Sequence, residues 1–180
     1  MAEMFKIEID DQAVQTMLKD LSRKAEDLSP LMRQTAGIMH DAVEQNFDQE
    51  GRPKWKGLSQ STINRREKKG HWPGKILQVK GQLAASINEQ HSKDFALVGT
   101  NKKYARAHQE GFSDTVSVSG FTRRQKSRDV REGRKTVAKG IAFVKAHSRQ
   151  MNIPARPFLN VTDRELRKIL DAGEGFLQPR

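Results

Sequence analysis

The chain has 180 residues, enough for one ordinary domain; only 35% of them are hydrophobic and 31% are charged. Cysteine is absent, which excludes disulfides, thiol catalysis and cysteine-ligated metal sites. The net charge of +11 indicates acidic partners, with nucleic acid first among them. No apolar run is long enough to span a membrane and no signal peptide is recognisable, so we expect no membrane partner and a protein that stays soluble inside a cell.

Most of the positive charge lies in two stretches. Residues 121–149 contain ten lysines and arginines against two acidic residues, a net charge of +8. Residues 52–75 contain eight such cations against one acidic residue, a net charge of +7. The remainder of the chain is slightly acidic, so any anionic partner is expected to meet these two stretches.

The N-terminal part predicts a strand followed by two helices. Phe5, Ile7 and Ile9 alternate with polar neighbours, as in a half-buried strand, and Asp10 or Asp11 is the expected N-cap of a helix. Its apolar positions have helical spacing and are Val14, Met17, Leu18, Leu21, Ala25 and Leu28. A second amphipathic helix is expected from Ser29-Pro30 to about Gln49, with an apolar stripe made of Met32, Ala36, Met39, Val43 and Phe47.

The middle of the chain predicts short elements between loops. In residues 48–59, glycines and a proline surround Trp55, which indicates a loop with an aromatic anchor. Ser59 or Ser61 can cap a short polar helix reaching Lys69. Residues 76–87 combine an apolar run with helical spacing, and residues 94–100 predict a strand. Residues 101–111 predict a short helix with Tyr104, Ala105 and His108 on one side and Gly111 as its stop.

Residues 113–150 predict a basic hairpin extension of the domain. Apolar residues alternate with polar ones near 115–123 and again near 140–149, and the residues between are charged with almost nothing apolar. The two arms resemble each other in sequence, VSGFTRRQ against VKAHSRQM, which would place Arg123 and Arg149 on a shared projection. The candidate contacts to protein or DNA are Arg123, Arg124, Lys126, Arg128, Arg131, Arg134, Lys135 and Arg149.

Three interpretations of this hairpin remain open from its residues. Its cations can neutralise phosphates, with aromatic residues stacking on bases. The segment can equally be a solubilising flap, or an arm that binds an acidic protein surface.

The segment IPARPFL, residues 153–159, predicts a stiff, extended strap. Each proline fixes its own φ and disfavours helix at the preceding residue. Thr162 and Glu165 then form an N-capping box that starts a C-terminal helix. In one interpretation Phe158 and Leu159 seat the strap in the core and Arg156 lies in solvent. In the other, the strap presents Arg156 to a neighbouring subunit or to a strand of its own sheet.

No pattern for catalysis or metal binding is present. The five histidines have no HExxH-like spacing, and phosphate-binding and nucleophile-elbow motifs are absent. His108 could act as a general base, but beside Tyr104 on a short helix it is more often a packed or interface residue. We therefore expect no enzyme, no metal and no cofactor.

Several separated motifs, in a fixed order, resemble the phage virion morphogenesis family. They are the loop EGRPKWKGLS, the run ILQVKGQLAASI, the segment DFALVGTNKKYARAHQEG, a basic hairpin, and IPARPFL before a helix. The similarity covers roughly residues 32–169 and points to the tail completion or head-tail joining proteins of Mu-like contractile-tailed phages. Val79-Lys80-Gly81 departs from it, because a serine or threonine is expected before the glycine.

The resemblance implies a structural protein at the head-tail junction of the virion, assembled in the host cytoplasm. It implies a homo-oligomeric ring or collar that contacts other tail or neck proteins, with DNA near the portal as a second partner. The expected fold is α+β, with two N-terminal amphipathic helices packed on a small, mainly antiparallel sheet, a protruding basic hairpin and a C-terminal helix. The candidate interface residues are Trp55, Tyr104, His108, Arg156, Pro157 and Phe158.

Overall fold

The computed structural model describes residues 11–125 and 140–178. Its helices are α1 (Gln12–Glu26), α2 (Ser29–Asp48), α3 (Gln60–Glu67), α4 (Ala105–Gln109) and α5 (Asp163–Leu177), with a single 3-10 turn at Ala84–Ser86. Its strands are β1 (Ile87–His91), β2 (Ala96–Thr100), β3 (Phe112–Val118), β4 (Phe121–Gln125), β5 (Gly140–Val144) and β6 (His147–Ile153). The α+β class is confirmed. The predicted strand at residues 5–9 and the basic tip at 126–139 lie outside the described residues.

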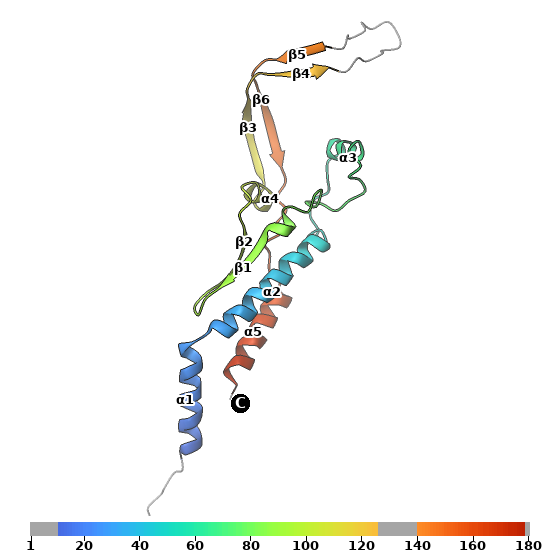
Figure 1. The fold of residues 1–180 in the computed structure, drawn as a ribbon. Coiled ribbons are helices and arrows are strands. Elements are labelled where there is room, and N and C mark those ends of the chain that lie inside the picture. Colours follow the sequence, from blue (N-terminus) through green and yellow to red (C-terminus); the bar gives the residue numbers. More distant parts are fainter. Residues whose placement is uncertain (1–10, 126–139, 179–180) are drawn as a thin grey trace, which may run out of the picture.

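The strands form three separate two-stranded antiparallel sheets. β1 pairs with β2, and α2 packs against both of them and against α5 (Figure 1). The strand predicted at 94–100 is confirmed as β2, whereas β1 begins at Ile87, where helical spacing was expected. Ile87 is buried in the core and starts the strand. Its spacing from the preceding apolar residues fits the last turn of a helix equally well, so the pattern alone did not separate the two.

Helix α1 begins after Asp11, as predicted, but it does not pack on a sheet. None of its residues is buried, and Val14, Met17 and Leu18 are exposed. Its tie to the rest of the chain is at its last turn, where Lys24 Nζ donates to the carbonyl of Gln178 at 2.6 Å. The expectation that both N-terminal helices pack on the sheet therefore holds only for α2.

The core joins α2 to the loop of residues 49–59 and to the strap. Phe47 of α2 contacts the rings of Trp55 and Phe158, with centroid distances of 6.0 and 5.4 Å. The prediction of Trp55 as an aromatic anchor is confirmed, because its side chain is buried in this cluster. The loop can bend beneath the indole only at a glycine, since Gly51 has φ of 98° and a Cβ there would lie 2.4 Å from Trp55 Cδ1.

A buried polar network closes the same core around Arg52. Its guanidinium donates to the carboxylate of Glu165 at 2.9 Å, to Asn46 Oδ1 at 2.9 Å and to the carbonyl of Ala42 at 2.9 Å. Asn46 Nδ2 in turn donates to the carbonyls of Phe158 and Asn160, each at 2.8 Å. Residues of the range 42–52 are thereby linked to residues of the range 158–165, about 110 positions later in the chain, with their buried polar groups satisfied.

Glu165 accepts one hydrogen bond of this network from Arg52 and also closes the predicted capping box, which is confirmed. Its side chain is 1% exposed and receives hydrogen bonds from Arg52 and from both the backbone and the hydroxyl of Thr162. Burial alone would raise the pKa of Glu165, but the hydrogen bonds from Thr162 and Arg52 and the charge of Arg52 outweigh it and lower that pKa to about 2. The carboxylate therefore stays charged inside the fold.

The other two strand pairs project away from this core (Figure 1). We call β3 paired with β6 the inner ribbon and β4 paired with β5 the outer ribbon. The two ribbons meet at an angle in Figure 1, so the predicted arms pair in two segments and not in one continuous hairpin. Arg123 lies opposite Ala142 in the outer ribbon, and Arg149 lies opposite Val116 in the inner one. The expected shared projection of Arg123 and Arg149 is therefore wrong.

Candidate functional site

The strap of residues 153–159 runs between α4 and the loop of residues 49–59, held mainly by its own backbone. The amide of Arg156 donates to the carbonyl of His108 at 2.6 Å, and the indole of Trp55 donates to the carbonyl of Pro157 at 3.0 Å. The amides of Phe158 and Leu159 both donate to Gln109 Oε1 at 3.0 Å. The two prolines of the strap have no backbone N–H to donate. The backbone amides of Arg156, Phe158 and Leu159 all have hydrogen-bond acceptors.

Arg156 does not lie in solvent, so that interpretation is wrong, and its contact with a neighbouring subunit stays a prediction. The residue is 6% exposed, and its guanidinium donates through Nε to the carbonyl of Lys56 at 3.0 Å and through Nη2 to that of Gly57 at 3.1 Å. The planar donor set of arginine reaches two successive carbonyls of the loop. Arg156 therefore braces the loop and forms part of the wall of a pocket.

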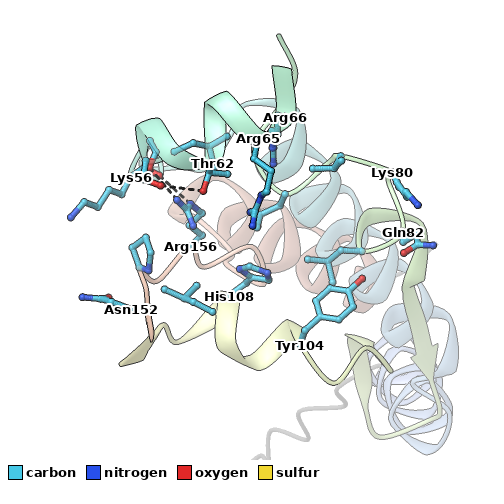
Figure 2. A pocket seen from close by; sticks show the side chains of 18 of the residues that line it. Lys56, Thr62, Arg65, Arg66, Lys80, Gln82, Tyr104, His108, Asn152 and Arg156 are labelled. Carbon is cyan, nitrogen blue, oxygen red and sulfur yellow. Dashed lines mark hydrogen bonds between the residues drawn. The ribbon is translucent and has the colours of Figure 1, made fainter. Parts of the chain in front are cut away.

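The pocket has a volume of about 870 Å³ and lies between α3, α4, the loop of residues 77–83 and the end of β6. Figure 2 shows Tyr104 and His108 on the side opposite Arg65 and Arg66, with Arg156 and Lys80 on the flanks. Its lining contains five lysines and arginines and no acidic residue: Lys56, Arg65, Arg66, Lys80 and Arg156. Its apolar wall consists of Leu58, Leu77, Val79, Leu83, Ile153 and Pro154. We call this the cationic pocket.

The positively charged side chains of the cationic pocket repel one another. Burial lowers the pKa of Arg156, and the charge of Arg66 lowers it further. Burial likewise lowers the pKa of Arg66, with Arg65 adding to the effect and Glu50 partly offsetting it. In the described part of the chain neither Arg66 nor Arg156 makes an ion pair; their hydrogen bonds go to backbone carbonyls. The pocket therefore holds positive charge that no ion pair of the described chain neutralises, and only the charge of Glu50 offsets part of it at Arg66.

His108 is half-buried and packs edge-to-face against Tyr104, with ring centroids 6.1 Å apart. Burial lowers the pKa of His108, and the charge of Arg156 lowers it further. Its Nδ1 atom is buried and has no hydrogen-bond partner in the described part of the chain. The imidazole is therefore neutral at physiological pH and keeps one ring nitrogen unsatisfied.

The predicted interface residues separate into two groups. Tyr104, His108 and Arg156 come together in the cationic pocket, whereas Trp55 and Phe158 are buried in the core behind it. Pro157 is exposed. Both rings are buried where the strap packs against the loop of residues 49–59. This burial contradicts the predicted contact of Trp55 and Phe158 with a neighbour.

The sequence reasoning missed Arg65, Arg66 and Lys80 as pocket residues. The net charge of +7 over residues 52–75 was the available signal for Arg65 and Arg66, and Lys80 lies outside that stretch. The charge did not show that Arg66 is buried with its guanidinium on the carbonyl of Lys75 at 3.0 Å. Of the hairpin candidates, Arg123, Arg124 and Arg149 are exposed on the ribbons. Lys126, Arg128, Arg131, Arg134 and Lys135 lie outside the described residues.

Among the described residues, one group could offer several ligand atoms to a metal ion. His40, Asp41 and Glu44 place one atom each within 4.8 Å of one another on α2. Both carboxylates are exposed, and exposed acidic groups of this kind are common without an ion, so the group supports no metal assignment.

Comparison with known proteins identifies the family. The model of the phage virion morphogenesis family matches residues 9–178. The chain belongs to this family. Its function therefore lies in the assembly of a phage virion, and the resemblance found from the ordered motifs is confirmed.

Three curated proteins are similar to this member of the phage virion morphogenesis family. The Mu-like prophage FluMu G protein 2 of Haemophilus influenzae is 32% identical over 176 residues, which cover 97% of both chains. The putative capsid assembly protein G of Escherichia phage Mu is 32% identical over 58% of this chain and 69% of its own. The FluMu G protein 1 of H. influenzae is 33% identical over 57% of this chain and 72% of its own.

No solved structure matches the chain. In residues 11–125 and 140–178, no helix is both long and apolar enough to cross a membrane.

Proposed function

We propose that this virion morphogenesis protein is a non-enzymatic structural subunit that completes the tail and joins it to the head. In this proposal several copies form a ring or collar at the head-tail junction and contact tail or neck proteins. No cofactor takes part. The support comes from the family and from surfaces of the chain that remain uncovered.

The observation that carries the proposal is the uncovered apolar surface of the projecting ribbons. In the outer ribbon Ile141 is 76% and Phe143 is 68% exposed. In the inner ribbon the register gathers apolar and charged residues on one face, while serine, threonine, asparagine and glutamine occupy the other. The members of the first face are Phe112, Val116, Val118, Met151 and Ile153 together with Asp114, His147 and Arg149. A two-stranded ribbon is only marginally stable alone, and exposed apolar residues of this kind are what a packing partner would cover.

The ribbons also have unpaired backbone edges, because every sheet in the described chain has two strands. Such edges accept an additional strand from a neighbour. The isolated chain has few hydrophobic residues with which to pack its ribbons. Pairing of a ribbon with the next copy or with a tail protein would supply this packing.

Disruption of the gene in its phage tests the proposal, with electron microscopy of the particles that form. We expect filled heads and separate tails, which join when the purified protein is added. Normal tailed particles would refute the role.

A second candidate is capsid assembly, which the name of the phage Mu relative favours. If the protein acts in capsid assembly, electron microscopy after disruption of the gene should show no complete heads.

The remaining alternative is a nucleic-acid-binding module that uses the basic residues of the predicted hairpin. Sedimentation with light scattering, at low and high salt and with or without duplex DNA, separates it from the assembly role. A homo-oligomer indifferent to DNA at about 150 mM salt agrees with the assembly role. Tight DNA binding that is lost at high salt and on removal of residues 125–139 would favour the nucleic-acid module.

A further inference from the structure

We infer that the cationic pocket is the receptor for a short acidic and apolar peptide segment of another virion protein. This inference deepens the proposed function, because it names the chemistry of a partner, and its identification as a virion protein rests on that function. The binding itself is testable with the purified chain alone.

The first argument is the uncompensated charge. Arg156 uses two of its five N–H donors on backbone carbonyls, and Arg66 uses one on the carbonyl of Lys75. Both side chains are buried, neither forms an ion pair and the lining contains no carboxylate, although the charge of Glu50 outside the lining acts on Arg66. A buried cation without a counter-ion is unfavourable, so a carboxylate that enters the pocket gains two partly desolvated guanidinium groups.

The second argument is the shape and the apolar wall. A volume of about 870 Å³ falls within the roughly 300–1,000 Å³ of sites that enclose a small ligand. Leu58, Val79 and Pro154 contribute to its wall between the cations. A phosphate backbone would leave this apolar wall in contact with charge, whereas a peptide with alternating apolar and acidic side chains satisfies both kinds of surface.

The third argument comes from the loop that forms one side of the pocket. Leu77 lines the pocket with φ of 62°, a left-handed conformation that a leucine rarely adopts. The carboxylate of Glu50 holds this loop by accepting the amide of Ile76 at 2.7 Å. Such backbone conformations persist where the surrounding structure enforces them and are found preferentially at binding sites.

Two rim cations make the inference testable without unfolding the protein. Arg65 and Lys80 line the pocket and are exposed, so their replacement removes charge but no buried contact. Arg123 and Arg124 on β4 are equally exposed and lie outside the pocket. The double variants Arg65→Gln with Lys80→Gln and Arg123→Gln with Arg124→Gln therefore change the net charge identically at two different places.

The experiment measures fluorescence anisotropy of a labelled peptide of alternating leucine and glutamate, with a leucine and glutamine peptide as the neutral match. We expect the acidic peptide to bind at least about tenfold more tightly than the neutral one. We expect the Arg65 and Lys80 double variant to lower that affinity about tenfold, and the Arg123 and Arg124 double variant to leave it within about twofold. An Arg156→Lys variant with an unchanged circular dichroism spectrum should also bind weakly, because lysine lacks the planar donor set.

Equal binding of the two peptides, or a loss of binding only in the Arg123 and Arg124 variant, would overturn the inference. Displacement of the peptide by a single-stranded oligonucleotide of matched charge, with equal or higher affinity, would also overturn it and would assign the pocket to nucleic acid. If the peptide binds but gene disruption leaves normal particles, only the proposed function fails. If heads and tails stay unjoined but the peptide does not bind, only the pocket inference fails.

Discussion

The strap region and the ribbons differ in where their side chains find partners. In the strap region Phe158 is fully buried, and the polar groups of Arg52, Asn46 and Glu165 satisfy one another. In the ribbons Ile141 and Phe143 project into solvent. The described chain therefore has its core at the strap, and in the proposed function an assembly packs the ribbons. Stability measurements can test that division.

The largest expected effect contrasts one phenylalanine from each region. Phe158→Ala removes a fully buried ring and should lower the free energy of unfolding by about 3–5 kcal/mol. Phe143→Ala removes an exposed ring and should change the free energy by less than about 0.5 kcal/mol. Urea denaturation followed by circular dichroism measures both. Equal losses would mean that the ribbons are part of the folded core.

The second effect is the acid sensitivity of the strap region. The pKa of Glu165 is lowered from 4.5 to about 2 in the folded chain. Its stabilisation is therefore present above the unfolded pKa and is lost as the pH falls through the folded one. Lowering the pH from about 6 to 2 should lower the free energy of unfolding of the wild type by about 3 kcal/mol through Glu165. The Glu165→Gln variant should not show this part of the loss.

Urea denaturation over this pH range checks the prediction for Glu165. The matched control is Glu174→Gln, an exposed carboxylate of the same helix, which should keep the acid dependence of the wild type. The interpretation of the network is wrong if Glu165→Gln and the wild type lose stability in parallel.

The third effect concerns the loop that holds the strap. Gly51→Ala places a Cβ 2.4 Å from Trp55 Cδ1 and 2.7 Å from the carbonyl of Pro53, at a φ of 98°. This change should cost about 2 kcal/mol or more. Gly57→Ala in the same loop meets no atom within 4 Å and should cost less than about 0.5 kcal/mol. Thermal melting of both variants decides whether the bend requires glycine.

The smallest effect is expected at His108, where the strap meets the pocket. Its folded pKa is lowered below 6.5 by burial and by Arg156, so the unfolded chain binds the proton more readily. The stability that His108 contributes is then present above its unfolded pKa and declines as the pH falls below it. His108→Asn should flatten the pH dependence between about 8 and 5, measured by urea denaturation. An unchanged slope would show that the imidazole is not desolvated.

Local patterns predicted much of the fold because they depend on neighbours in sequence. The capping box at Thr162 and Glu165, the helix stop at Gly111 and the strand at 94–100 each follow from short-range geometry, and all three were confirmed. Helix α1 was identified by its apolar spacing, but spacing says nothing about whether a partner covers that face. Its exposed Val14 and Leu18 show the difference.

The site was harder to predict than the fold. Tyr104, His108 and Arg156 were chosen as interface candidates, and they do share one pocket, but Trp55 and Phe158 were chosen with them and lie in the core. An aromatic ring beside a proline has the same pattern whether it seats a strap or faces a neighbour. In the sequence Arg65 is only part of the charged stretch of residues 52–75, and Lys80 stands out only as part of Val79-Lys80-Gly81. Their role depends on which loop lies across from them.

By itself the sequence determined the family, the α+β class and the stiffness of the strap, since these rest on ordered motifs, short-range periodicity and the restricted φ of proline. Only the tertiary structure decided that Arg156 is buried, that Arg52 pairs with Glu165 and that five cations line one pocket. The physical reason is that burial and charge pairing depend on segments about a hundred residues apart in the chain, as Arg52 and Glu165 are.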